Sequence, residues 1–278
     1  MRPIDDTLTT AVRRDAGLLP LAVVVVLATA ALAATPAWSA DISVRQITEL
    51  LFRADRRAPA DLRGRSLEGL DLAGLDFKGA RLDDADLFGT DLTRTRLDGA
   101  SLEGVRLDRA IVIRAVFTGA RLKGARLRSL TVFSGVEPDP ADAPRFDGAD
   151  LSGAEIVARL DGANFSGANL TDTRLGPQPA IWGSYTPRAM LIGANFSAAE
   201  LRRTDLRNAV LHFARFVNAT VIDTSFRGAD LTGADFTGAE IAGSDFTGAT
   251  LDGAIFTGAR GLDRATGLPP STSDAGRP

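Results

Sequence analysis

The sequence predicts a repeat protein in which many short units stack to form one continuous hydrophobic core. Every fifth residue is apolar from Leu62 to Val132, fifteen positions without exception, and again from Leu191 to Phe256, fourteen positions. Ala stands two residues before 24 of the 36 apolar positions in the whole chain, and 21 of the 28 glycines stand two residues after one. A five-residue unit cannot bury an apolar face alone, so successive units must stack on each other.

Between these two runs the spacing is less regular. A longer period, of twenty residues, is superimposed on the five-residue period. The apolar positions resume at Phe146, slip by one residue before Leu160, and continue to Leu175. In the last run, residues twenty positions apart are alike: Phe196, Phe216, Phe236 and Phe256 form one series, and Thr204, Thr224 and Ser244 form another. This period indicates a coil of four units in which like side chains lie on like.

The segment GADLTGADFTGAEIAGSDFTGATLDGAIFTGA, residues 228–259, resembles the pentapeptide repeat family, whose units read Ala, Asp or Asn, Leu and two variable residues. The resemblance covers residues 60–261. It implies an all-β solenoid, a right-handed quadrilateral β-helix in which four pentapeptides make one coil. The 36 units then make about nine coils.

Residues 1–40 are predicted to be a targeting segment that is separate from the repeats. Leu18–Ala34 is a run of seventeen residues without a charged side chain, and it follows Arg13 and Arg14. This order is typical of a secretory signal peptide. The run also reaches the lower limit, about 17 residues, for an uncleaved membrane anchor. Both alternatives predict an exported protein, periplasmic or extracellular, and the second keeps it anchored through residues 18–34.

Residues 41–59 are predicted to form an N-terminal capping helix, from about Ser43 to Ala54, and a linker. Ser43 followed by Gln46 indicates a capping box, and an apolar stripe follows: Val44, Ile47, Leu50 and Leu51. Because the end of a solenoid exposes its core, we expect this helix to plug the first coil.

Residues 60–261 are the predicted β-helix. Stacking at the inter-strand spacing of about 4.8 Å builds its core, and the small Ala residues let the walls approach each other. Gly, or Asn at Asn208 and Asn218, suits the corners because these residues tolerate positive φ.

Two loops are predicted to interrupt the β-helix, residues 133–145 and residues 176–190. The first contains three prolines and three acids, which suits a tolerated insertion at the surface. The second contains Trp182 and Tyr185, which are candidate binding anchors because exposed aromatic residues on loops often contact partners. Alternatively, this loop folds back and covers the wall where the spacing slips.

Residues 262–278 are predicted to be a disordered tail because they are rich in Pro, Ser, Gly and charge. The last coil is then left without a cap. Some pentapeptide repeat proteins dimerise through the C-terminal coil, so the resemblance makes a homodimer through this coil one expected arrangement.

Charge is distributed unevenly along the repeats. Between Arg94 and Arg128 nine basic residues stand against three acids, a balance of +6, whereas between Asp223 and Asp252 one Arg stands against six acids, a balance of −5. The basic segment suggests a surface for a partner protein or an anionic envelope component, although outward repeat positions must be polar in any case. The candidate partner-binding residues are Arg106, Arg121, Arg126, Trp182 and Tyr185.

Composition argues against several classes of function. The chain has no Cys and one His, His212, which disfavours thiolate chemistry, a Ser-His-Asp triad and a multi-His metal site. The net charge of −3 disfavours nucleic-acid binding. We therefore predict no catalytic, cofactor-binding or metal-binding residues, and no enzymatic activity.

The sequence thus favours an exported, non-enzymatic protein that acts as an interaction or structural scaffold at the cell envelope. The alternative comes from the family resemblance: some members, including quinolone-resistance proteins, mimic DNA and bind type II topoisomerase in the cytoplasm. Export and the basic segment from Arg94 to Arg128 argue against mimicry, and only the acidic coils from Asp223 to Asp252 fit it.

Overall fold

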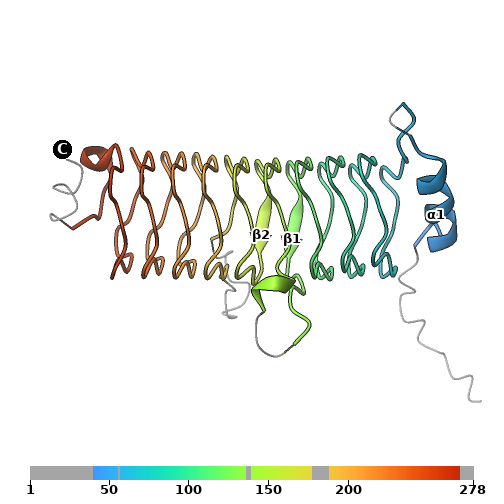
Figure 1. Ribbon diagram of the computed structural model, residues 1–278, viewed down its shortest axis with the longest axis horizontal. Coiled ribbons are helices and arrows are strands. Elements are labelled where there is room, and N and C mark those ends of the chain that lie inside the picture. The colour runs from blue at the N-terminus through green and yellow to red at the C-terminus, as the bar shows by residue number, and fades with distance from the viewer. Residues whose placement is uncertain (1–39, 56, 136–138, 177–187, 270–278) are drawn as a thin grey trace, which may run out of the picture. The chain divides into compact units, whose positions relative to one another are not determined.

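The structure is a computed structural model that describes residues 40–55, 57–135, 139–176 and 188–269 (Figure 1). All of them belong to one compact unit, Trp38–Pro278. Trp182 and Tyr185, and the predicted targeting segment up to residue 39, lie outside the described residues. No helix among the described residues has the length and apolar character needed to cross a membrane.

The chain winds into stacked coils joined by parallel β-bridges between residues that are mostly twenty positions apart (Figure 1). The bridges form four ladders, one on each side of the coil. We call the sides A to D after the bridge that begins each ladder: Asp61 to Arg81, Ser66 to Asp86, Asp71 to Asp91, and Asp76 to Arg96. The two longest strands, β1 (Arg126–Arg128) and β2 (Glu155–Val157), pair in parallel on side B.

The apolar position of each unit points into the stack. Of the 36 such positions predicted from the sequence, 35 are buried, and Leu251 in the last coil is partly exposed. They form a single core together with the small residues two positions earlier. Where the small residue is Thr or Ser, its hydroxyl donates to a main-chain carbonyl of the previous coil, as Thr204 Oγ1 does to Leu170 O at 2.8 Å. A buried hydroxyl is tolerated there because it is hydrogen-bonded.

Phenylalanine rings stack through the core across both interruptions. Centroids 4.9 Å apart join Phe117 to Phe146 across the first interruption, and centroids 5.0 Å apart join Phe165 to Phe196 across the second. The predicted series from Phe196 to Phe256 continues this stack at 4.6–5.0 Å. Both insertions therefore leave the inward register intact.

The corners of the coils are occupied by residues with positive φ. Most are Gly, and Asn208 and Asn218 adopt φ 55° and 56°, as the sequence predicts. Corner positions also hold residues that the pattern did not single out, including Phe213 at φ 56°.

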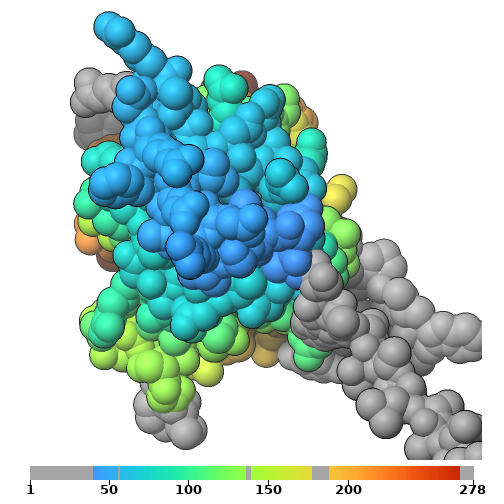
Figure 2. All heavy atoms as spheres, turned by 90° about the vertical axis from the view of Figure 1, so that its right-hand side faces the viewer, coloured from blue at the N-terminus to red at the C-terminus, as the bar shows by residue number. Residues whose placement is uncertain are grey.

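A helix, α1 (Val44–Arg53), lies where the sequence predicts one. Ser43 is its N-cap, and Ser43 and Gln46 form the reciprocal hydrogen bonds of a capping box. Ile47 is fully buried, and Val44 and Leu51 pack against the same core as the coils. In Figure 2 the atoms of this helix lie across the end of the stack.

At the other end, the prediction of a disordered tail is wrong for its first residues. Leu262–Arg264 form a short 3-10 helix, η2, and Thr266 bridges to Asp245 on side B. Leu262, Ala265 and Leu268 pack against the core. The chain stays ordered because these apolar residues cover part of the last coil, and composition alone does not show that contact.

Candidate interaction surface

The three arginines Arg106, Arg121 and Arg126 lie on two neighbouring sides of the stack. Arg106 and Arg126 bridge each other on side B, and Arg121 lies on side A, between Ser101 and Asp150. Their side chains point outward and are 38%, 58% and 47% exposed in that order. The structure thus brings the three together over two successive coils.

Each of these guanidinium groups already has an acidic partner. Arg106 Nη1 donates to Asp86 Oδ2 at 2.8 Å. Arg126 Nη2 lies 3.1 Å from Asp108 Oδ2, and Arg121 Nε donates to Glu103 Oε1 at 3.2 Å. Exposed ion pairs of this kind contribute little to stability, about 0–1 kcal/mol, but they determine how much free positive charge the surface presents.

The basic segment is less basic in the folded molecule than in the linear sequence. Four of the acids that pair with it lie outside residues 94–128: Asp76, Asp86, Asp142 and Glu155. Counting them lowers the excess of positive charge from six to two. Among the described residues, the cations of this segment without an ion pair are Arg94, Arg109 and Lys123, and all three are exposed.

Phe88 belongs to this surface, and the sequence interpretation did not identify it. The guanidinium carbon of Arg106 lies 4.2 Å from the centroid of its ring, and that of Arg109 lies 5.9 Å away. A cation over an aromatic face is held by cation–π attraction. The signal in the sequence is an aromatic residue at an outward repeat position, directly after the inward Leu87.

The first interruption is tied to the coils more firmly than a tolerated insertion requires. Asp142, in the short 3-10 helix η1 (Pro140–Asp142), is 2% exposed. It accepts hydrogen bonds from Ser134 Oγ at 2.6 Å and from Arg114 Nε at 2.8 Å. These bonds, from Ser134 first and then Arg114, hold the pKa of Asp142 below its ordinary value of 3.8.

The second interruption is described only at its two ends. Trp182 and Tyr185 fall within residues 177–187, outside the described part of the chain. Gly176 and Arg188, the residues that border this gap, are buried and exposed respectively. The insertion therefore joins side B, after Leu175, to side C, before Met190.

His212 points outward, as expected from its place after the inward Leu211. Its Nε2 lies 2.6 Å from Asp230 Oδ2, and its side chain is 35% exposed. Within the described residues, no group of three or more His, Asp or Glu side chains is placed to hold a metal ion.

The acidic coils from Asp223 to Asp252 are also partly neutralised. Arg227 Nη1 lies 3.0 Å from Asp245 Oδ2, and Arg260 Nε lies 3.3 Å from Glu240 Oε2. Hydrogen bonds from Thr247 and from Arg227 lower the pKa of Asp245. Pairing between coils thus reduces the free charge at both ends of the charge gradient.

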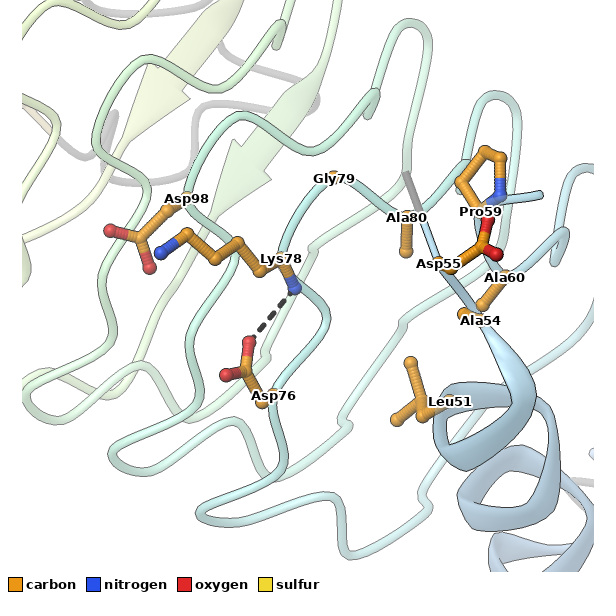
Figure 3. Close-up of a pocket in the computed structure, with 10 residues that line it drawn as sticks. All are labelled: Leu51, Ala54, Asp55, Pro59, Ala60, Asp76, Lys78, Gly79, Ala80 and Asp98. Atoms are coloured by element: carbon orange, nitrogen blue, oxygen red, sulfur yellow. Dashed lines mark hydrogen bonds between the residues drawn. The ribbon is translucent and has the colours of Figure 1, made fainter. Parts of the chain in front are cut away.

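A hollow of about 770 Å³ lies at the N-terminal end, where the helix leads into the first coil (Figure 3). Leu51, Ala54 and Ala80 are among its apolar lining residues. The carboxylates of Asp76 and Asp98 lie on its charged side, where the Lys78 side chain extends toward Asp98 (Figure 3). The hollow lies along the junction between α1 and the first coils.

A comparison with known protein families identifies the repeats. The family model described as pentapeptide repeats matches residues 60–94, 95–129, 158–176, 189–228 and 222–258, in eight copies and over more than half of the chain. No curated protein matches the sequence significantly.

Solved structures of pentapeptide repeat proteins are also similar. HetL of the cyanobacterium Nostoc sp. strain PCC 7120, involved in the regulation of heterocyst differentiation, is 26% identical over 80% of this chain and 98% of its own, with a TM-score of 0.29. Full-length QnrB1, a plasmid-mediated fluoroquinolone resistance protein, is 19% identical over 68% of this chain and 92% of its own, with a TM-score of 0.30. Rfr23 of the cyanobacterium Cyanothece 51142 is 22% identical over 54% and 88%, with a TM-score of 0.23.

Proposed function

The chain belongs to the pentapeptide repeat family, and we propose that it is a non-enzymatic interaction scaffold at the cell envelope. Members of this family form right-handed quadrilateral β-helices and are generally non-enzymatic. One observation carries the proposal. The interior is filled by the chain's own side chains, since 35 of the 36 inward positions are buried. Small-molecule and catalytic sites are normally concave, whereas this stack has its outward positions available for contact.

Export is the second part of the proposal, and it rests on the sequence. The apolar run Leu18–Ala34 acts either as a cleaved signal peptide or as a retained anchor. The test is to fractionate cells that express the full chain and to determine its mature N-terminal residue by mass spectrometry. A start between Ala34 and Asp41 in the periplasmic or secreted fraction, or an intact chain in the membrane fraction, agrees with export. An intact chain in the cytosol contradicts it.

The proposed contact residues are Arg106, Arg121, Arg126, Trp182 and Tyr185, which suit a partner protein or an anionic envelope component. Replacing Trp182 or Tyr185 by Ala should abolish capture of the partner by the full chain and leave the far-ultraviolet circular dichroism unchanged. Thr257→Ala is the matched control, because Thr257 points outward and is remote in sequence from the three arginines and from the two aromatic residues. Capture that survives the aromatic substitutions removes the loop from the interface.

We further propose that the solenoid has about nine coils and that α1 is its N-terminal cap. Support comes from the burial of Ile47 and from the hydrogen bond of Asp41 N to Ser66 O at 3.1 Å, which joins the start of the helix segment to side B.

A homodimer through the C-terminal coil is part of the proposal as well. On sides C and D the last bridges end at Thr250 and Ile255, and Ile255 is 46% exposed. Unpaired strand edges tend to pair with another chain. Analytical ultracentrifugation of the full chain tests this, with Ile255→Lys expected to shift a dimer to monomers.

DNA mimicry remains the second candidate, and the acidic coils from Asp223 to Asp252 are the observation that favours it. It predicts that the purified chain inhibits supercoiling by DNA gyrase. The scaffold proposal predicts no inhibition, so one assay separates the two.

A further inference from the structure

The four sides of the stack differ in their outward residues. The isolated bridges of sides A and B join polar residues, and the β1–β2 pairing on side B adds Leu127, Ile156 and Val157. Apolar residues occur in the bridges of the other two sides: Val116 and Ile255 on side D, and Ile111, Met190 and Val210 on side C. On side C the outward positions two residues after Ile111 and Met190 are again apolar, Ile113 and Ile192. All five residues lie outside the hydrophobic core; Val210 is buried, and the other four are partly exposed.

Both insertions meet this same side. Residues 133–145 leave the stack directly after Val132 on side C, and the chain returns from residues 177–187 directly before Met190 on side C. The ladder of side C is also interrupted between these points, since among the described residues no bridge joins Thr131 to Arg159. Interruptions of regular pairing are frequent next to binding sites.

Free positive charge borders the apolar residues of side C. Arg109 precedes Ile111 at the corner between sides B and C, Arg94 lies at the corner after side C one coil earlier, and Arg188 precedes Met190. All three are exposed and have no ion pair among the described residues. Of the acids on this side, Asp161 is neutralised by Arg159, with 2.6 Å between Oδ2 and Nε. Asp91, which bridges Ile111, has no ion pair among the described residues, so three free cations stand against one free carboxylate at this position.

We propose that side C between Ile111 and Val210 is the docking surface for a partner-protein segment that carries apolar side chains and carboxylates. Ile113 and Ile192 lie three coils apart, about 14 Å at the spacing of paired strands. An extended segment of about five residues covers that length. Its apolar side chains would contact the Ile and Met residues, and its carboxylates would meet the bordering Arg residues.

The same observations disfavour another occupant, a second copy of this chain. A second copy that presented its own side C would bring Arg94, Arg109 and Arg188 against like charges. An extended segment of another protein does not meet this obstacle.

This inference rests on the proposed scaffold function and assigns its contact to side C, in place of sides A and B, which carry Arg106, Arg121 and Arg126. The test places the photoreactive residue p-benzoylphenylalanine in the full chain at Ile113 or Ile192, in the native host, and identifies the crosslinked peptides by mass spectrometry. The matched controls carry it at Glu103 or Thr171, outward positions on side A in the same two coils. A second comparison combines the probe at Ile113 with Arg109→Glu or, as control, with Lys123→Glu on side A.

We expect adducts from the two side C positions alone, with a partner peptide that contains both apolar and acidic residues. Arg109→Glu should lower the yield about fivefold or more, and Lys123→Glu should leave it unchanged. The assignment of side C is overturned if adducts form from side A only, or equally from all four positions. It is also overturned if the adducts contain lipid or peptides of this chain itself. A partner protein captured from side A would still agree with the scaffold function, whereas the absence of adducts at all four positions would contradict both proposals.

Discussion

Phe213 is a bulky side chain at a corner position that elsewhere holds mostly Gly or Asn. Its φ of 56° lies in the left-handed region, which costs a residue with a Cβ about 1–2 kcal/mol. Its ring is 64% exposed and lies over Gly233 of the next coil, where a Cβ would come within 2.5 Å of it. The residue therefore adds backbone strain and little burial.

We predict that Phe213→Gly raises the free energy of unfolding by about 0.5–1 kcal/mol, because relief of the strain exceeds the added backbone entropy of the unfolded chain. Thermal and urea unfolding followed by circular dichroism measure the change. Asn218→Gly is the control, since Asn already tolerates this conformation, and it should change stability little. A loss of stability in the Phe213 variant would mean that packing of the ring on the next corner outweighs the strain.

Asp142 shows how a single carboxylate can hold an insertion. Because hydrogen bonds from Ser134 and Arg114 hold its pKa below 3.8 in the folded protein, its contribution is present above the unfolded pKa. That contribution is lost as the pH falls through the lower, folded value. At neutral pH, Asp142→Asn should therefore loosen residues 139–145, and in the native chain acid should do the same.

Hydrogen exchange at Asp142 and Ala143 measures this effect, and we expect it to be roughly tenfold faster in the variant. Asp139→Asn is the matched control, because Asp139 only caps η1, accepting from Ala141 N at 2.8 Å, and Asn is an equally good cap. Equal acceleration in both variants would assign the effect to the loss of charge in general.

Among the elements, α1 is a short helix that is attached to the coils through one of its faces. Ile47 is fully buried, whereas Phe52 on the other side is 90% exposed. Most of the stability of a ten-residue helix must come from packing, because such a helix is marginal alone. The helix and the first coil should therefore lose their structure together.

We predict that Ile47→Asp removes hydrogen-exchange protection from α1 and from residues 62–77 while residues 211–246 stay protected, because repeat stacks couple mainly to their neighbours. Native-state exchange with mass spectrometry reads both regions. Thr48→Asp, on the exposed part of the same helix, should leave both unchanged. Loss of protection along the whole stack would contradict a cap that acts locally.

At the scale of the whole molecule, the Phe stack is the element that crosses both insertions. We predict that Phe196→Ala, which truncates a fully buried ring between Phe165 and Phe216, lowers the free energy of unfolding by about 3–5 kcal/mol. Urea unfolding measures the loss. Phe196→Leu should cost much less because it fills most of the volume, and an equal loss in both variants would point to ring stacking in place of volume.

The residues that point into the core could be predicted from the sequence, whereas most contacts between outward side chains could not. Positions such as Phe117 and Phe146 are set by a five-residue period that burial enforces, so a linear pattern reveals them. Pairs such as Arg114 with Asp142, or Arg203 with Asp172 at 2.7 Å, depend on how many residues an insertion adds between coils. That number follows only from the folded register, so Asp142 and Glu155 could not be assigned as partners from the sequence. Asp76 and Asp86 differ, because each lies twenty residues before its arginine, and the twenty-residue period places each pair on one side of the stack.

The order of the β-bridges also gives the molecule a mechanical signature. Regular coils are closed by bridges between residues twenty apart, but Val116 bridges Arg145 and Arg159 bridges Met190, at separations of 29 and 31. When the chain is pulled from one end, coils should detach one after another, each releasing about 65 Å of extended chain. The two coils that contain the insertions should release about 100 Å each, so a stretching trace would show where along the molecule the rupture has reached.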